Sequence, residues 1–434
     1  MVTAAPRLES LDHIIQERIP PDGPGAAVAV IQGGQVIHSA GYGMASLEWS
    51  QPVGPDTVFG IGSTTKPFTA TAIMLLERDG LLATAAPITD YLPDYDTHGA
   101  TITLTHLLTH TSGIPNFITR PGFWERVAPL DHDHLQLRAL FEPLPLDFAP
   151  GERYRYSNSG YCLLGMVIER VAGMPYADFV RERIFEPLGM ASSGYLSRNR
   201  VIPRLAMGYE MEWRIAGFRP HVSETLVYSA GAIHSTVEDL ARWDAALRDA
   251  RLLDRETLAR MERPLTLNDA RHEGYGLGWG LSRFRGRPVV RHAGSVPGYS
   301  AFLGRFVEDD LTIIILSNWG LFDAARLLAR PIAGLLLDLP EPPMPEHTPS
   351  IEASALARMA GSYANGIGDV VEFTVDGGRL SASGELTADL IPISDTAFRA
   401  AHDADITVSF EDMTASGYAR AKIVVPFYWY YVYR

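Results

Sequence analysis

The apolar and polar positions divide the first three quarters of the chain into strand-rich ends and a helix-rich middle. Residues 26–40 predict a β-hairpin that turns at Gly33-Gly34, because paired glycines adopt the positive φ angles of tight turns. Strand patterns return much later in the chain, at residues 275–281, 300–307 and 311–317. Strands at both ends predict one antiparallel sheet built from distant segments and covered by helices, which is an α+β fold.

From Ser63 to about Arg251 the apolar positions recur mostly at helical spacing. A capping box is predicted at Ser235-Thr-Val-Glu238, ahead of the periodic run that contains Trp243. A last helix is predicted near residues 322–336. The middle of the chain therefore supplies the helical layer.

A proline-rich stretch separates this region from the C-terminal part. Residues 339–350 contain five prolines, which remove backbone donors and fix φ, and they predict an interdomain linker. The chain after the linker predicts a small all-β barrel, with short alternating segments between Gly, Asp and Ser turns at 370–375, 379–383, 389–394, 406–410 and 419–426. We expect a large domain at 1–338, the linker at 339–350 and the barrel at 351–434.

Composition and charge limit the classes of binding partner that we expect. The formal net charge is −14 and the chain has no run of Lys and Arg, so a nucleic-acid partner is not expected. The longest apolar runs, such as 311–316, are far shorter than the ~20 residues that span a bilayer, and the N-terminus does not have the pattern of a secretory leader. We expect a cytoplasmic protein without a membrane partner, unless a leader was removed. Cys162 is the single cysteine, lies in an apolar run and is predicted to be buried.

The strongest chemical signal is Gly62-Ser63-Thr-Thr-Lys66 at the start of a helical run. On a helix the i, i+3 spacing places a serine hydroxyl and a lysine amine on one face, within hydrogen-bonding reach. Of the 37 basic residues, 35 are Arg, and the two lysines are Lys66 and Lys422. A neutral lysine can accept a proton whereas an arginine cannot, so this choice of residue favours a base at position 66. The alternative is a helix cap beside a surface lysine.

Other motifs predict no metal and no cofactor. His106 and His110 have i, i+4 spacing, but a Glu does not follow His106 as it would in a zinc protease. The Asp131-His-Asp-His134 cluster predicts a solvated helix start, and Gly274 to Gly280 predicts a tightly packed strand instead of a phosphate loop. A Gly-x-Ser-x-Gly nucleophile elbow does not occur, so any esterase activity would have to use Ser63.

Two further segments complete a family resemblance. Tyr156-Ser-Asn158 precedes a helical run, and His292-Ala-Gly294-Ser295 follows much later. With Ser63-Thr-Thr-Lys66 they resemble, in order, the three signatures of the penicillin-binding-protein and class C β-lactamase superfamily (peptidase S12-like): Ser-x-x-Lys, Tyr-x-Asn and Lys-or-His-x-Gly. The resemblance covers roughly residues 10 to 335. The C-terminal part resembles the lipocalin-like barrels that some members carry.

The resemblance implies a role for each residue of these signatures. Ser63 would be the nucleophile, Lys66 and Tyr156 would move its proton to the leaving group, and His292 would add positive charge or hydrogen bonds beside Tyr156. Substrate-binding roles would fall to Asn158, which holds the acyl-side amide, and to Gly294 and Ser295, where the backbone N–H of Ser295 joins that of Ser63 in an oxyanion hole.

One position departs from the family pattern. Ala293 stands where members that recognise β-lactams often carry Thr or Ser, so a hydroxyl for a substrate carboxylate is missing and β-lactamase activity is disfavoured. Three functions remain open. The first is an acyl-enzyme hydrolase of amide bonds in small peptides or amino-acid amides, D-stereospecific or not. The second is a carboxylesterase or acyltransferase, and the third is a non-catalytic ligand-binding protein. The expected partners are a small-molecule or short peptide substrate and, in a homo-oligomer, further copies of the chain.

Overall fold

The structure is a computed structural model that describes residues 4–197, 199–212, 215–218, 222–320, 323–343, 348–364, 370–425 and 428–434. Its internal contacts divide the chain into two units. The large unit comprises Met1–Leu281 and Pro288–Ala333, and the small unit comprises Ser282–Arg287 and Gly334–Arg434. Among the helices of the described part, none is long and apolar enough to cross a membrane.

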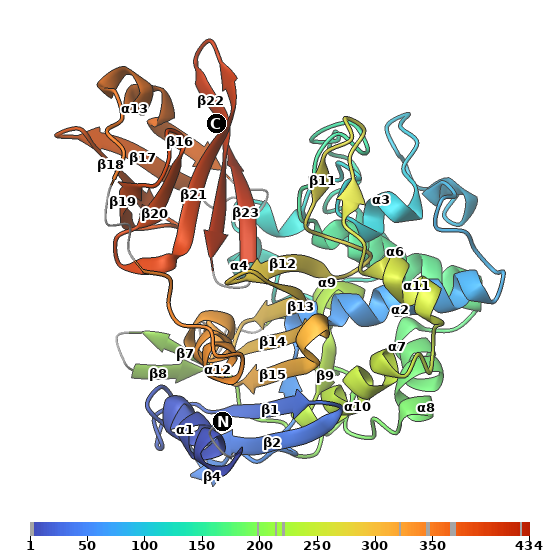
Figure 1. Cartoon of the computed structure of the whole chain (residues 1–434). Coiled ribbons are helices and arrows are strands. Elements are labelled where there is room, and N and C mark those ends of the chain that lie inside the picture. Colours follow the sequence, from blue (N-terminus) through green and yellow to red (C-terminus); the bar gives the residue numbers. More distant parts are fainter. Residues whose placement is uncertain are drawn as a thin grey trace. The chain divides into compact units, whose positions relative to one another are not determined.

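A six-stranded sheet organises the large unit (Figure 1). Its order is β12-β13-β14-β15-β1-β2, with bounds β12 (Gly280–Phe284), β13 (Arg287–Val296), β14 (Tyr299–Phe306), β15 (Leu311–Ser317), β1 (Ala26–Gln32) and β2 (Gln35–Tyr42). β1 pairs antiparallel with β15, in a register that runs from Ala26 opposite Ser317 to Gln32 opposite Leu311. The predicted hairpin and the predicted antiparallel sheet from the two ends of the domain are confirmed.

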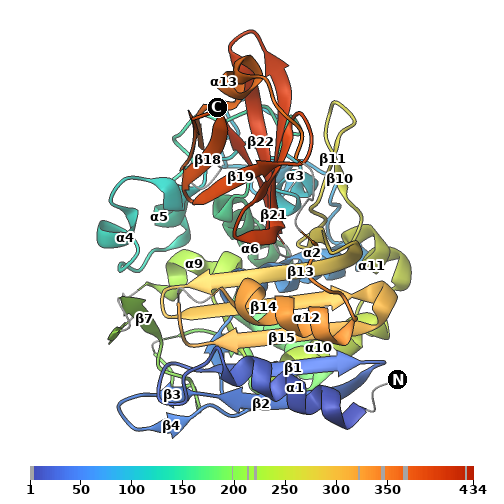
Figure 2. The same cartoon turned by 60° about the vertical axis from the view of Figure 1, so that its left-hand side comes forward.

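The central strands are buried on both faces, which explains their continuous apolar sequence. Every residue of β14 and β15 is buried. Helices α1 (Ala4–Gln16) and α12 (Arg330–Leu336) lie on one face of the sheet, and α10 (Val237–Arg248) lies on the other (Figures 1 and 2). The helix predicted near residues 322–336 is observed as a π-helical turn at Ala325–Ala329 that leads into α12, and residue 322 lies outside the described residues.

The middle of the chain is mainly helical, as predicted. Its helices are α2 (Lys66–Arg78), α3 (Leu104–Leu108), α4 (Phe123–Arg126), α5 (His134–Arg138), α6 (Asn158–Ala172), α7 (Tyr176–Val180), α8 (Glu186–Leu188), α9 (Glu224–Gly231) and α11 (Arg255–Met261). Short strands that the sequence pattern did not reveal lie within this region and on both sides of it. These are β3 (Met44–Ser46), β4 (Gln51–Pro52), β5 (Phe59–Gly60), β6 (Gly194–Tyr195), β7 (Tyr209–Glu212), β8 (Ile215–Phe218), β9 (Ile233–Ser235), β10 (Leu265–Thr266) and β11 (His272–Glu273).

Two local predictions are corrected. The N-cap of α10 is Thr236, whose side chain accepts from the Asp239 backbone N–H, because Ser235 belongs to β9. The predicted strand at 275–281 begins only at Gly280. The preceding turn packs too closely for side chains: a Cβ at Gly276 would lie 2.1 Å from the Met261 carbonyl oxygen.

The small unit contains a closed barrel, which confirms the predicted all-β tail. Its strands, in order around the barrel, are β16 (Gly361–Ala364), β17 (Val370–Asp376), β18 (Arg379–Gly384), β19 (Ala388–Pro392), β20 (Ala397–Ala400), β21 (Asp403–Thr414), β22 (Gly417–Val425) and β23 (Tyr428–Tyr433). Helix α13 (Ala353–Met359) precedes them. Aromatic side chains fill the core, with Phe373 and Phe398 each packed edge to face against Phe410. The described residues of 339–350 form neither helix nor strand.

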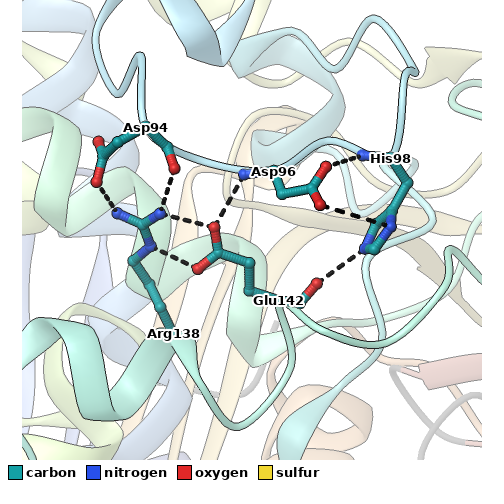
Figure 3. A network of polar contacts seen from close by, with 5 residues as sticks. All are labelled: Asp94, Asp96, His98, Arg138 and Glu142. Carbon is teal, nitrogen blue, oxygen red and sulfur yellow. Dashed lines mark hydrogen bonds and ion pairs between the residues drawn. The ribbon is translucent and has the colours of Figure 1, made fainter.

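A charged network holds the long segment between α3 and α6 (Figure 3). The buried Arg138 donates to the side chains of Asp94 and Glu142, at 2.7 Å and 2.6 Å for the shortest contacts. Glu142 also accepts from the backbone N–H of Asp96 at 2.9 Å. Burial would raise the pKa of Glu142, but the hydrogen bonds from Arg138 and Asp96 hold it below its ordinary value. The segment is therefore pinned at the end of α5.

A buried ion pair ties α10 to the sheet. Arg305 on β14 donates from Nε to Asp244 of α10 at 3.1 Å, and Thr312 on β15 donates to the same carboxylate at 2.9 Å. Arg305 and Asp244 are only 8% and 1% exposed. Removing Arg305 would leave the buried Asp244 carboxylate with only the more distant Arg248, at 3.6 Å, as a counterion.

We expect Arg305→Met to lower the free energy of unfolding by about 3–5 kcal/mol, because Asp244 would remain buried and charged. The matched control is Arg204→Met, since Arg204 pairs with Asp56 at the surface and both side chains are largely exposed. Such pairs contribute about 0–1 kcal/mol. Urea denaturation of both variants measures the difference, and equal losses would contradict a structural role for the buried pair.

Candidate active site

Ser63 and Lys66 lie at the junction of a 3-10 turn (Gly62–Thr65) and helix α2. In a 3-10 turn residues i and i+3 are eclipsed, so the lysine side chain stacks directly on the serine. The Lys66 Nζ lies 3.2 Å from Ser63 Oγ, 2.8 Å from Asn158 Oδ1 and 2.9 Å from the Ala230 carbonyl oxygen. Lys66 is fully buried and Ser63 is partly exposed.

The partners of Lys66 prepare it to act as a base. Burial lowers its pKa from 10.5 to about 7. Asn158 Oδ1 and the Ala230 carbonyl oxygen only accept hydrogen bonds. In the neutral amine its two hydrogens therefore go to these two atoms, and its lone pair is left facing the Ser63 hydroxyl. This arrangement allows the amine to take the serine proton.

Tyr156 and Asn158 are positioned by the start of α6. Ser157 is the N-cap residue, with an extended backbone, and its side chain accepts from Gly160 N at 3.5 Å. The chain direction therefore changes between Tyr156 and Asn158, which turns both side chains toward Lys66. The Lys66 Nζ lies 4.7 Å from the centre of the Tyr156 ring.

The third predicted segment, on β13, lies against the Ser63 turn. A Cβ at Gly294 would lie 1.9 Å from the Ile61 carbonyl oxygen, and a Cβ at Gly62 would lie 2.8 Å from the Ser295 backbone nitrogen. The two backbones can approach this closely only because both positions are glycine. The backbone of Ser295 therefore lies directly against the turn that carries Ser63.

Of the two roles predicted for His292, positive charge or hydrogen bonds, the surroundings of the ring favour hydrogen bonds. Both of its ring nitrogens are engaged, with Nδ1 2.7 Å from the Ala293 carbonyl oxygen and Nε2 3.0 Å from the Tyr275 hydroxyl. Burial, and then the charge of Lys66, hold its pKa well below the usual value. The imidazole is therefore neutral.

Residues without an assigned role in the sequence complete the surroundings. His110 is buried, its Nδ1 accepts from the Ser157 backbone N–H at 3.1 Å, and its ring lies 4.3 Å from that of Tyr156 and 4.8 Å from that of Tyr275. Asn116 accepts from both the backbone and the side chain of Asn158, at 3.2 Å and 3.4 Å. In the sequence, the glycines around Tyr275 indicate close packing. No sequence pattern marks Asn116 or the Ala230 carbonyl as part of the site.

The structure brings all the predicted site residues together. Ser63 and Asn158 are hydrogen-bonded to Lys66, and the Tyr156 ring contacts the Lys66 amine. The backbones of Gly294 and Ser295 pack closely against the turn that carries Ser63. His292 reaches this group through Tyr275 and His110. Within the described residues, no group of three or more His, Cys, Asp or Glu side chains gathers as metal ligands would.

We expect Gly294→Ala to slow covalent labelling of Ser63 by a fluorophosphonate about 10²–10³-fold, because the clash with Ile61 displaces β13 and with it the backbone N–H of Ser295, the predicted second donor of an oxyanion hole. The control is Gly173→Ala, at the C-terminus of α6, where φ is +68° and nothing lies within 4 Å. That variant should lose about 1 kcal/mol of stability and keep its labelling rate. Equal labelling of both variants would refute the close approach.

Similar known proteins identify the family of the chain. The family model described as Beta-lactamase matches residues 11–336. Penicillin-binding protein 4* of Bacillus subtilis (strain 168) is 31% identical over 399 residues, which cover 86% of each chain. D-aminopeptidase of Gluconobacter oxydans (strain 621H) is 26% identical over 344 residues, which cover 78% of this chain and 63% of that protein.

Two solved structures are similar as well. The octameric penicillin-binding protein homologue from Pyrococcus abyssi has a TM-score of 0.67 and 26% identity, covering 99% of this chain and 100% of its own. The D-amino acid amidase from Ochrobactrum anthropi SV3, complexed with L-phenylalanine amide, has a TM-score of 0.63 and 26% identity, covering 76% and 96%. The family match spans most of the large unit and contains all three signature segments, so the chain belongs to the beta-lactamase family.

Proposed function

We propose that the chain is a serine hydrolase that cleaves amide bonds of amino-acid amides and small peptides through an acyl-enzyme at Ser63. The observation that carries the proposal is the buried Lys66 amine, whose pKa of about 7 and fixed partners leave its lone pair for the Ser63 hydroxyl. A structural lysine would gain nothing from losing its charge at neutral pH.

In the acylation step Ser63 Oγ attacks the substrate carbonyl carbon while its proton passes to Lys66. The negative charge that develops on the carbonyl oxygen is stabilised by the backbone N–H groups of Ser63 and Ser295. When the C–N bond breaks, the proton is delivered to the leaving nitrogen by way of Tyr156. Asn158 orients the acyl part of the substrate and holds the Lys66 amine in place.

Deacylation uses the same groups in reverse. A water molecule attacks the ester carbonyl carbon of the acyl-enzyme and gives its proton to the Lys66 and Tyr156 pair. The ester bond to Ser63 then breaks, and the proton returns to Ser63 Oγ. The products are a free acid and a regenerated enzyme, and the cycle needs no cofactor.

A pocket near the Ser63 turn supports a mainly apolar acyl side chain. It has a volume of about 200 Å³, and its lining includes Leu196, Leu205, Val227, Val296 and Tyr299. It also includes Gly231, where a Cβ would lie 3.8 Å from the carbonyl carbon of Gly62. The pocket therefore lies near the backbone of the turn that carries Ser63. Its lining, which also contains Arg200 and Glu224, fits an aliphatic or aromatic side chain that lies close to polar groups.

The relatives support a D-configured acyl residue. One is named D-aminopeptidase and one solved structure is a D-amino acid amidase. We propose that this chain also acts on D-configured residues. We also propose that it forms an octamer like the Pyrococcus abyssi homologue, which light scattering would test. The alternative is a carboxylesterase or acyltransferase, favoured by Ala293, which is exposed and offers no hydroxyl to a substrate carboxylate.

We expect the wild type to hydrolyse D-leucine p-nitroanilide faster than its L-enantiomer, and Ser63→Ala to lose this activity about 10⁴-fold or more. Absorbance assays with both anilides and with p-nitrophenyl acetate distinguish the alternatives. Ser63-dependent hydrolysis of the ester with inert anilides would make the esterase primary. Anilide hydrolysis that survives Ser63→Ala would refute the nucleophile.

We expect kcat/KM to rise with pH through an ionisation near pH 7 and to fall about tenfold per unit below it, because only neutral Lys66 can take the proton. Lys66→Arg should remove about 10²–10⁴-fold of activity, since a guanidinium stays protonated. The matched control is Lys422→Arg on the barrel strand β22, which should leave the profile unchanged. An ionisation that persists in Lys66→Arg would assign it to another group.

A further inference from the structure

The hydrogen of the His292 ring has one possible position. The Ala293 carbonyl oxygen, 2.7 Å from Nδ1, can only accept, so Nδ1 carries the hydrogen. In a neutral ring Nε2 is then bare, and it accepts from the Tyr275 hydroxyl at 3.0 Å. The two contacts together fix one tautomer of a neutral imidazole.

The surroundings of His292 oppose its protonation. The ring is 4% exposed. The charged and titratable groups near it are Lys66 on α2, its neighbour Arg291 on β13, the buried His110, and Tyr275 from the turn before β12, and none of them carries a negative charge at neutral pH. The charges of Lys66 and Arg291 lower its pKa further below the usual value, after burial itself.

Tyr275 is held where it meets His292. Its pKa is raised well above the usual value by burial, so it stays a phenol and a donor. Its own turn packs against α2: a Cβ at Gly278 would lie 2.6 Å from Ala70 Cβ and 3.2 Å from the Lys66 carbonyl oxygen. The backbone of the turn that carries Tyr275 is therefore held against α2 beside Lys66.

The rest of segment 292–295 offers little to an anion. Ala293 presents a methyl group, Gly294 has no side chain, and the Ser295 hydroxyl is directed to the Gly320 carbonyl oxygen at 3.4 Å. A carboxylate is bound tightly where a cation or several donors face it. His292 is the one titratable side chain of this segment, so its charge decides what the segment can bind.

We infer that this site takes substrates whose leaving group carries no carboxylate, because His292 is buried beside Lys66, has no acidic partner among the described residues, and is held as a neutral Nδ1–H imidazole by the Ala293 carbonyl and Tyr275. The inference rests on the proposed acyl-enzyme function and names its substrate class. In the proposed mechanism the leaving atom receives its proton by way of Tyr156, and His292 is connected to Tyr156 through the contacts of Tyr275 and His110. Tyr275 is thus a positioning residue that acts through His292.

The kinetic test compares two substrates that differ only in the charge of the leaving group, D-leucyl-glycinamide and D-leucyl-glycine. The wild type should prefer the amide by about tenfold or more in kcat/KM, the factor given by one missing charge-assisted hydrogen bond. The ester pair methyl 3-acetoxybenzoate and 3-acetoxybenzoate makes the same comparison if the enzyme is an esterase. Equal rates within the cleaved pair, or a preference for the carboxylate, would overturn the inference.

The lock itself is tested in the full-length protein by nitrogen NMR of the histidine rings, with the His292 signals identified by their loss in His292→Gln. The wild type should show a protonated Nδ1 and a bare Nε2 that do not titrate between about pH 6 and 9. Tyr275→Phe should let His292 gain a proton toward pH 6 and reduce the preference for the uncharged leaving group there, because only the neutral ring can accept that hydroxyl.

The matched control is Tyr154→Phe, which removes another hydroxyl of the same aromatic cluster and should leave the His292 signals unchanged. An Nε2–H tautomer, or a wild-type titration centred above pH 6, would overturn the lock whatever the kinetics. If only the ester pair is cleaved, the amidase proposal fails. The rates of the two esters then still show whether the enzyme prefers an uncharged leaving group.

Discussion

The buried amine of Lys66 is the constraint on which the rest of the site depends. A lysine ammonium without solvent must have acceptors for its hydrogens, and Ser63, Asn158 and Ala230 supply them from three different elements. The 3-10 turn, the start of α6 and the end of α9 have to meet at one point for this to happen. Two of the three acceptors can never donate, so the loss of one proton leaves the lone pair facing Ser63.

Glycine makes the meeting of these elements possible on the other side of Ser63. Gly62 and Gly294 let two backbones approach more closely than any side chain would allow, and Gly278 does the same for the turn that carries Tyr275. The polar groups of the site are thus fixed by backbone contacts, whereas the apolar core of the large unit surrounds them. Such a site is preorganised before a substrate arrives.

The two buried histidines, His110 and His292, are neutral because they lie close to Lys66 and away from solvent. His110 accepts from a backbone N–H through Nδ1, and His292 accepts from Tyr275 through Nε2, so the two rings hold opposite tautomers. A positive charge on either ring would lie close to Lys66 in a medium of low dielectric constant. Of Lys66, His110 and His292, only Lys66 therefore titrates near neutral pH. A single titrating group suits a site that transfers a single proton.

The sequence by itself determined the classes of element and the chemical types in the site. The hairpin at 26–40, the strands 300–307 and 311–317, the barrel tail and the Ser63 and Lys66 pair all follow from local periodicity, turn residues and spacing, which depend on near neighbours only. Only the tertiary structure decided the short strands β5, β6 and β9, the turn at Tyr275 and the neutral charge of His292. Each of these depends on atoms from distant segments, such as the Met261 carbonyl against Gly276, and no local pattern encodes a contact between segments far apart in the chain.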